Sequence, residues 1–162
     1  MAVKLLEIKK ESCPPTRLIG KKYAPGCVNW GEWWENNWFA TLEAMQCLPF
    51  NGDAYIGAVH IVEGMPEYWI GMFFPQNTQV PEGFEFVDIE AMDYAMCYLH
   101  APEGSGEFYS METHDMCLEA LKAQGMMRKE DSWCVERCNC PRYTAPDEQG
   151  CVILDYGIAI EA

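Results

Sequence analysis

Two segments in the first half of the chain carry apolar runs that are bounded by glycine and proline. Residues 55–62 and 67–74 have the length and composition of β-strands, and the Glu-Gly-Met-Pro segment 63–66 between them is typical of a hairpin turn. Neither strand alternates cleanly between apolar and polar positions. This pattern predicts that both faces of the hairpin are covered or that one face lines a cavity.

Helical periodicity begins earlier, in the segment 30–47. Its apolar side chains recur at spacings of three and four residues, which places them on one helical face. These residues are Trp30, Trp33, Trp34, Trp38, Thr41, Leu42 and Met45. Core packing accounts for Trp34 and Trp38. Trp30 and Trp33 stand at the helix entrance, where they are candidates for a cavity wall.

The order strand, helix, strand, strand occurs once in each half of the sequence. The first half, about 1–75, has a strand at 16–23, a helix at 30–47 and strands at 55–62 and 67–74. The second half, about 82–162, has a strand at 91–100, a helix at 106–124 capped by Gly125, and strands at 132–138 and 151–160. A turn-rich stretch, 74–83, connects them. We expect a single domain over 1–162 with an internal repeat.

Composition narrows the function classes. The 162 residues carry a net charge of −14, which argues against direct binding to nucleic acid phosphates. Nine cysteines without a small-domain framework indicate free thiols in a reducing compartment. The sequence shows neither a signal peptide nor a stretch of about 18 apolar residues. These features predict a cytoplasmic protein that does not enter a membrane and needs no cofactor.

An acidic residue interrupts the apolar strand predicted at 132–138. A buried, unpaired carboxylate costs several kcal/mol, roughly, so Glu136 should have a raised pKa, pair with Arg137 or Arg142, or await a cationic or hydrogen-bonding ligand. The alternative is an edge strand from which Glu136 points into water.

Four segments follow one another along the chain: Tyr68-Trp69-Ile70-Gly71, Pro81-Glu82-Gly83-Phe84-Glu85-Phe86, Ile89-Glu90-Ala91-Met92-Asp93-Tyr94-Ala95 and Val135-Glu136. Together, in this order and at these separations, they resemble the GyrI-like small-molecule-binding domain, also called the AraC-type effector-binding domain. The resemblance covers nearly the whole chain, and it is clearer after residue 66. Two positions depart from the family pattern: Glu90 stands where a proline is common, and Cys138 stands where a tyrosine is common.

The resemblance implies an α+β fold of two strand-helix-strand-strand units related by a pseudo-twofold axis. A curved antiparallel sheet and two main helices would then enclose a central cleft. In related drug-sensing regulators a buried glutamate on the penultimate strand meets cationic aromatic ligands, and Glu136 is the matching position. Cys138 puts the ligand class in question, because a thiol offers less surface and a weaker hydrogen bond than a tyrosine.

The leading hypothesis is therefore a stand-alone module that binds hydrophobic, cationic aromatic small molecules for sensing or sequestration. The predicted ligand-binding residues are Glu136, Trp33, Tyr55, Trp69, Tyr94, Phe108, Tyr109 and Cys138. No helix-turn-helix pattern accompanies them, so a role in transcription would need a partner protein. Aromatic rings would add cation-π attraction of about 0.5–2 kcal/mol for each contact.

Two alternatives come from other functional classes. Some GyrI-like proteins resemble hydrolases of reactive, cyclopropane-containing toxins, and Glu136 would then activate water as a general base. The acidic surface could instead engage a basic protein partner, such as a regulator or DNA gyrase.

Metal binding and nucleophilic catalysis have weaker support. Cys134, Cys138 and Cys140 share one side of a regular strand and would need His100 or His114 as a fourth ligand, but three thiolates on one strand cannot easily surround a zinc ion. His60 and the other two histidines show no nucleophile motif, and no phosphate-binding glycine loop is present. We therefore expect no metal site and packed, free thiols.

Overall fold

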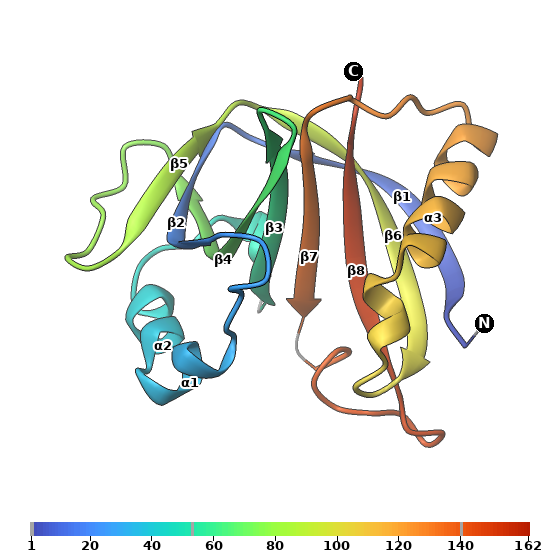
Figure 1. Ribbon diagram of the computed structural model, residues 1–162, viewed down its shortest axis with the longest axis horizontal. Coiled ribbons are helices and arrows are strands. Elements are labelled where there is room, and N and C mark those ends of the chain that lie inside the picture. Colours follow the sequence, from blue (N-terminus) through green and yellow to red (C-terminus); the bar gives the residue numbers. More distant parts are fainter. Residues whose placement is uncertain (1, 53, 140) are drawn as a thin grey trace.

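The computed structural model describes residues 2–52, 54–139 and 141–162. In these residues eight strands form one antiparallel sheet, in the order β1-β6-β8-β7-β3-β4-β2-β5 (Figure 1). The strands are β1 (Lys4–Cys13), β2 (Thr16–Tyr23), β3 (Ala54–Val62), β4 (Met65–Pro75), β5 (Glu85–Ile89), β6 (Met92–Pro102), β7 (Trp133–Asn139) and β8 (Cys151–Ile160). The helices are α1 (Gly31–Glu35), α2 (Trp38–Glu43) and α3 (Met111–Ala123), with short 3-10 turns η1 (Pro49–Asn51) and η2 (Gly106–Tyr109). The expected α+β class is confirmed.

Six of the strands lie where the sequence pattern predicts them. The hairpin of β3 and β4 turns through Glu63 and Gly64, both at positive φ, so the turn is shorter than the predicted segment 63–66. The strands β1 and β5 were not predicted. The ten residues of β1 are mostly exposed and rich in lysine and glutamate, because β1 is an edge strand beside β6.

The helix predicted at 30–47 is instead two short helices, α1 and α2. Asn37 between them adopts a left-handed conformation with φ of 55°, which asparagine tolerates better than most residues. The Asn36 side chain donates a hydrogen bond of 2.8 Å to the carbonyl of Glu32, and so it satisfies an acceptor near the end of α1. This break turns Trp34 and Trp38 in different directions.

The strand order is symmetric about the contact between β7 and β3. In each half of the chain the first predicted strand (β2 or β6) lies farther out, the third (β4 or β8) lies next to it, and the second (β3 or β7) lies at the centre. A duplicated unit would give this order, and the duplication itself stays a prediction.

Two separate apolar clusters lie on the helix-bearing face of the sheet. One packs α3 against β6 and β8, and the other packs α1 and α2 against β2 and β4. A third cluster fills the opposite face and includes Leu18, Phe73 and Met96. The central strands β3 and β7 lie between the two helical clusters (Figure 1), and Trp34 of α1 and Phe39 of α2 contact Tyr55 on β3.

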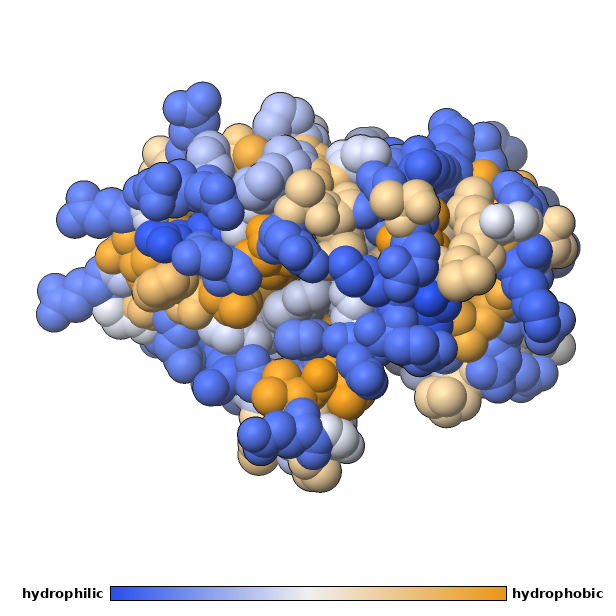
Figure 2. All heavy atoms as spheres, turned by 90° about the horizontal axis from the view of Figure 1, so that it is seen from above, coloured by the Kyte–Doolittle hydropathy of each residue, from blue (hydrophilic) through white to orange (hydrophobic). Residues whose placement is uncertain are grey.

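The outer surface agrees with the acidic, polar composition. Figure 2 shows hydrophilic side chains over most of one face, with apolar side chains between them in small groups. No helix in the described part of the chain is long and apolar enough to cross a membrane.

A buried ionic network crosses the sheet face opposite the helices. Arg137 on β7 donates to Asp155 on β8 at 2.7 Å and to Glu11 on β1 at 3.0 Å. Arg142, from the loop after β7, donates to the same Asp155 carboxylate at 2.8 Å. Arg137 also contacts the Phe50 carbonyl at 3.1 Å, so the buried guanidinium is well compensated.

Replacement of Asp155 tests the importance of this network. We expect Asp155→Asn to lower the free energy of unfolding by about 3 kcal/mol, because it leaves two guanidinium groups without their shared, fully buried partner. Urea unfolding measures the loss. Asp88→Asn is the matched control, since Asp88 pairs with Arg17 at an exposed position and should matter much less. Equal losses in both variants would contradict the assignment.

Candidate functional site

A cleft lies over β3 and β7, between α1 on one side and η2 with the start of α3 on the other. It contains two cavities of about 570 and 490 Å³. The two cavities share three lining residues, Tyr68, Tyr109 and Glu136. Glu136 therefore stands at the boundary between them.

Strand alternation builds the floor of the cleft. On β7, Cys134, Glu136 and Cys138 point to one face, so that Cys138 lines the first cavity and Cys134 lines the second. The paired residues on β3 have the same orientation, with Tyr55 opposite Cys138 and Gly57 opposite Glu136. The structure thus places Cys134 and Cys138 on the same side of the strand as Glu136, as their even spacing predicts.

Gly57 provides the space in which Glu136 sits. A Cβ atom at this position would overlap the Tyr68 hydroxyl, would lie 2.6 Å from Oε1 of Glu136 and would lie 3.1 Å from the Trp30 ring. Any side chain at position 57 would therefore displace the groups around the carboxylate.

The Glu136 carboxylate is desolvated by burial, and none of the described cationic side chains forms an ion pair with it. β7 lies between β8 and β3, so the alternative that Glu136 points into water from an edge strand is wrong. Arg137 and Arg142 bind Asp155 on the opposite face, so the alternative that one of them pairs with Glu136 is wrong. The Tyr68 hydroxyl donates a hydrogen bond to Oε1. Burial raises the pKa of Glu136 to about 6, although this hydrogen bond acts in the other direction.

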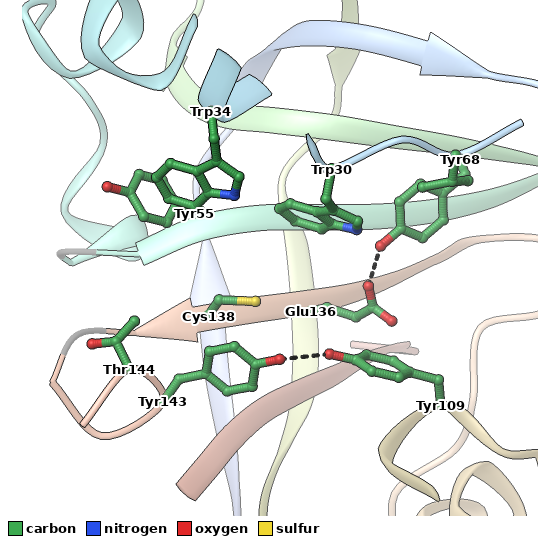
Figure 3. A pocket seen from close by; sticks show the side chains of 10 residues that line it. Trp30, Trp34, Tyr55, Tyr68, Tyr109, Glu136, Cys138, Tyr143 and Thr144 are labelled. Carbon is green, nitrogen blue, oxygen red and sulfur yellow. Dashed lines mark hydrogen bonds between the residues drawn. The ribbon is translucent and has the colours of Figure 1, made fainter. Parts of the chain in front are cut away.

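Aromatic side chains form most of the first cavity wall. Figure 3 shows Trp30, Trp34 and Tyr55 on the side of the α1 segment and Tyr109 with Tyr143 on the other. The hydroxyls of Tyr109 and Tyr143 are 2.8 Å apart and share a hydrogen bond. Among the lining residues that the structure describes, Glu136 alone is charged. The arrangement suits an apolar ligand that carries a positive charge.

The second cavity is more polar. His114 and Tyr156 meet there, with Nδ1 and the hydroxyl 2.7 Å apart. Burial lowers the pKa of His114, and the nearby positive charge of Arg128 adds to this effect. His114 is therefore neutral near pH 7.

The structure brings five of the eight predicted ligand-binding residues to the cleft. Tyr55, Tyr109, Glu136 and Cys138 line the first cavity, and Phe108 lines the second. Their role in binding stays a prediction.

The structure places Trp33, Trp69 and Tyr94 in the core, away from both cavities. Trp33 is fully buried between α2 and the sheet. Trp69 and Tyr94 point to the opposite face of the sheet. Because neighbouring strand residues alternate, it is Tyr68 rather than Trp69 that reaches the cleft.

Sequence reasoning missed three aromatic residues of the first cavity or assigned them differently, namely Trp34, Tyr68 and Tyr143, whereas Trp30 was a candidate for the cavity wall and lies there. Trp34, expected in the core, is 55% exposed and lines the cavity. Trp30 and Trp34 are four residues apart, and this spacing could have grouped them on one side of the helix. Tyr68 stands next to the predicted Trp69, and only the pairing of β4 with β3 decides which of the two faces the cleft. Tyr143 lies in a loop that carries no periodic signal.

The structure does not gather the cysteines of β7 around a histidine. Cys134 and Cys138 face different cavities, and Cys140 lies outside the described residues. Within the described ranges, the cluster of potential metal ligands is another one, His100 with Asp147 and Cys151. Asp147 accepts backbone hydrogen bonds at 2.9 and 3.0 Å there, which gives it a structural role in its loop. His60 stacks on Trp133.

The raised pKa of Glu136 gives stability a defined pH dependence. Between pH 4.5 and about 6 the folded protein binds more protons than the unfolded chain, so the contribution of Glu136 is present below pH 4.5 and is lost as the pH rises through 6. We expect Glu136→Gln to raise the free energy of unfolding near neutral pH by about 1–2 kcal/mol and to flatten this part of the profile. Urea unfolding across this range measures both effects. Glu119→Gln, on the exposed side of α3, is the control, and identical pH profiles for wild type and Glu136→Gln would contradict the assignment.

The comparisons with known proteins concern the fold. No family model matches the sequence, and no curated protein matches it. Among solved structures, SAV2435 bound to tetraphenylphosphonium has a TM-score of 0.69 at 12% identity, over 97% of this chain and 95% of that one. A candidate bacterial transcription regulation protein from Staphylococcus aureus MU50 has a TM-score of 0.66 at 11% identity, over 96% and 99% of the two chains.

The C-terminal domain of EcmrR is also similar, with a TM-score of 0.58 at 6% identity over 96% of this chain and 97% of that one. At such identities the likeness concerns the fold, and it agrees with the resemblance found in the sequence. The chain therefore shares the fold of these three proteins, which agrees with the fold that the sequence resemblance implies.

Proposed function

We propose that this protein binds hydrophobic, cationic aromatic small molecules in the first cavity, for sensing or sequestration. The observation that carries the proposal is the Glu136 carboxylate, which is desolvated, receives one hydrogen bond from Tyr68 and has no cationic partner within the described residues. A bound cation would supply the missing opposite charge.

The cavity has suitable dimensions and surfaces for this role. Its volume of about 570 Å³ falls in the usual range for small-molecule sites, roughly 300–1,000 Å³. Trp30, Trp34 and Tyr55 offer ring faces and edges to an apolar body, and each ring that meets a cation adds about 0.5–2 kcal/mol. The similarity to SAV2435, whose structure contains tetraphenylphosphonium, supports the same ligand class here.

A second function has one specific observation in its favour. A carboxylate with a pKa of about 6 beside a tyrosine hydroxyl could serve as a general base, so hydrolysis of a reactive, cyclopropane-type compound is the alternative. A hydrolase would deplete such a compound in large molar excess over the protein, whereas a binding module would remove one equivalent.

The binding proposal is tested with tetraphenylphosphonium and with neutral triphenylphosphine oxide, by calorimetry and tryptophan fluorescence. We expect the wild type to prefer the cation, and Glu136→Gln to weaken cation binding at least about tenfold while leaving the neutral compound nearly unchanged. Cation binding should also weaken below about pH 6, as Glu136 becomes protonated.

Glu119→Gln removes the same charge from an exposed helical position and should bind both compounds as the wild type does. Equal affinity of the wild type for the cation and the neutral compound would overturn the proposal. Unchanged cation binding in Glu136→Gln would overturn the assigned role of the carboxylate.

A further inference from the structure

Arg128 differs from the other arginines of the chain in its surroundings. The four arginines are Arg17, Arg128, Arg137 and Arg142. The other three form ion pairs with Asp88, Asp155 or Glu11. In the part of the chain that the structure describes, no carboxylate forms an ion pair with Arg128. This is notable because acidic residues outnumber basic ones by 25 to 11.

Arg128 lines the second cavity of the cleft. Its backbone is held at the end of β8, where it pairs with Ile160. The residues on both sides are fixed to the same region, because Lys129 donates to the Ala159 carbonyl at 2.9 Å and Glu161 donates to the Met127 carbonyl at 2.8 Å. The base of the side chain is therefore anchored at the cavity without a structural ion pair that would occupy its charge.

The other polar groups of this cavity do not replace that charge. His114 is neutral near pH 7, because burial and Arg128 both lower its pKa. Ser132 and Tyr156 contribute hydroxyl groups, and Glu136 contributes its carboxylate at the boundary with the first cavity, where it forms no ion pair with Arg128. Arg128 therefore carries the only full positive charge among the described residues that line this cavity, and a guanidinium presents up to five N–H donors to an anion.

The two cavities lie along one strand. Their shared floor on β7 runs from Cys134 to Cys138, with Glu136 at the middle, a distance of about 13 Å at the usual strand rise. Glu136, Tyr68 and Tyr109 form the boundary between them. Tyr109 is 52% exposed, so a substituent can pass this boundary on the solvent side without displacing the strands.

We propose that the second cavity is an anion subsite, and that the preferred ligands are zwitterions with an aromatic cation in the first cavity and a carboxylate at Arg128. This inference rests on the proposed function, because the first cavity must hold the cationic part. It adds that the preferred ligand carries an anionic substituent on a short flexible arm, which binding in the first cavity alone does not require.

A pair of phosphonium probes tests the inference. Pentyltriphenylphosphonium and (4-carboxybutyl)triphenylphosphonium share the same aromatic cation and differ in the terminal group. We expect the wild type to bind the carboxylate probe about tenfold more tightly than the alkyl probe, although the net charge of −14 alone would disfavour an added negative charge. Arg128→Gln should abolish this preference and leave the affinity for the alkyl probe within about twofold.

Two further variants separate the subsite from general effects. Lys129→Gln removes the same charge at the next residue, where the side chain pairs with Glu90 at 3.1 Å outside the cleft, and it should retain the preference. Arg128→Lys keeps the charge without the planar donor array and should retain part of it. Thermal unfolding of all variants checks that they are folded.

The outcomes distinguish this inference from the proposed function. If the alkyl probe binds in a Glu136-dependent manner but the carboxylate probe binds no more tightly, the proposed cation binding in the first cavity is supported and the anion subsite is overturned. An equal loss of preference in Arg128→Gln and Lys129→Gln would overturn it as well. If neither probe binds the wild type, both proposals fail.

Discussion

Glu136 and Arg137 follow one another on β7, so strand alternation sends two desolvated charges to opposite faces of the sheet. Arg137 meets Asp155 and Glu11 at 2.7 and 3.0 Å, and both carboxylates are held by neighbouring parts of the same sheet. Glu136 meets the hydroxyl of Tyr68 instead. On one face of β7 the charge of Arg137 is thus balanced by ion pairs. On the other face the charge of Glu136 has no ion-pair partner among the described residues.

This asymmetry explains how the protein can keep an unbalanced carboxylate. The network around Arg137 joins β7 to β8 and β1, and it holds β7 in place on the sheet face opposite the cleft. The aromatic rings above the strand limit access of water, which raises the pKa of Glu136 to about 6. Ring surfaces adapt to ligands of many shapes, whereas a single fixed charge selects their sign.

The sequence predicted the sheet better than it predicted the cleft. Strands such as β3 and β4 carry long apolar runs, which periodicity detects, whereas the edge strand β1 is mostly exposed and polar and escaped notice. The break of the first helix depends on one residue, Asn37, whose left-handed conformation no periodicity reveals.

The burial of Glu136 could be predicted from its apolar neighbours in the sequence. Which aromatic residues form the cavity wall depends on strand pairing and loop conformation, which a single sequence does not reveal. Tyr68 and Trp69 are both large and aromatic, and only the pairing of β4 with β3 decides which of them faces the cleft. Arg128 lies outside any predicted element, and its significance depends on the absence of an ion pair among the described residues, which only three-dimensional contacts can show.

Gly57 has a consequence for how such a site can change. The residue contributes no atoms to the cavity lining, but the space above it sets how deep the Glu136 carboxylate sits. A larger side chain there would displace the carboxylate from its present position, because even a Cβ atom would lie 2.6 Å from Oε1. The proposed preference of the cleft for cations can therefore be tuned from the adjacent strand, at a position outside the described residues that line the two cavities.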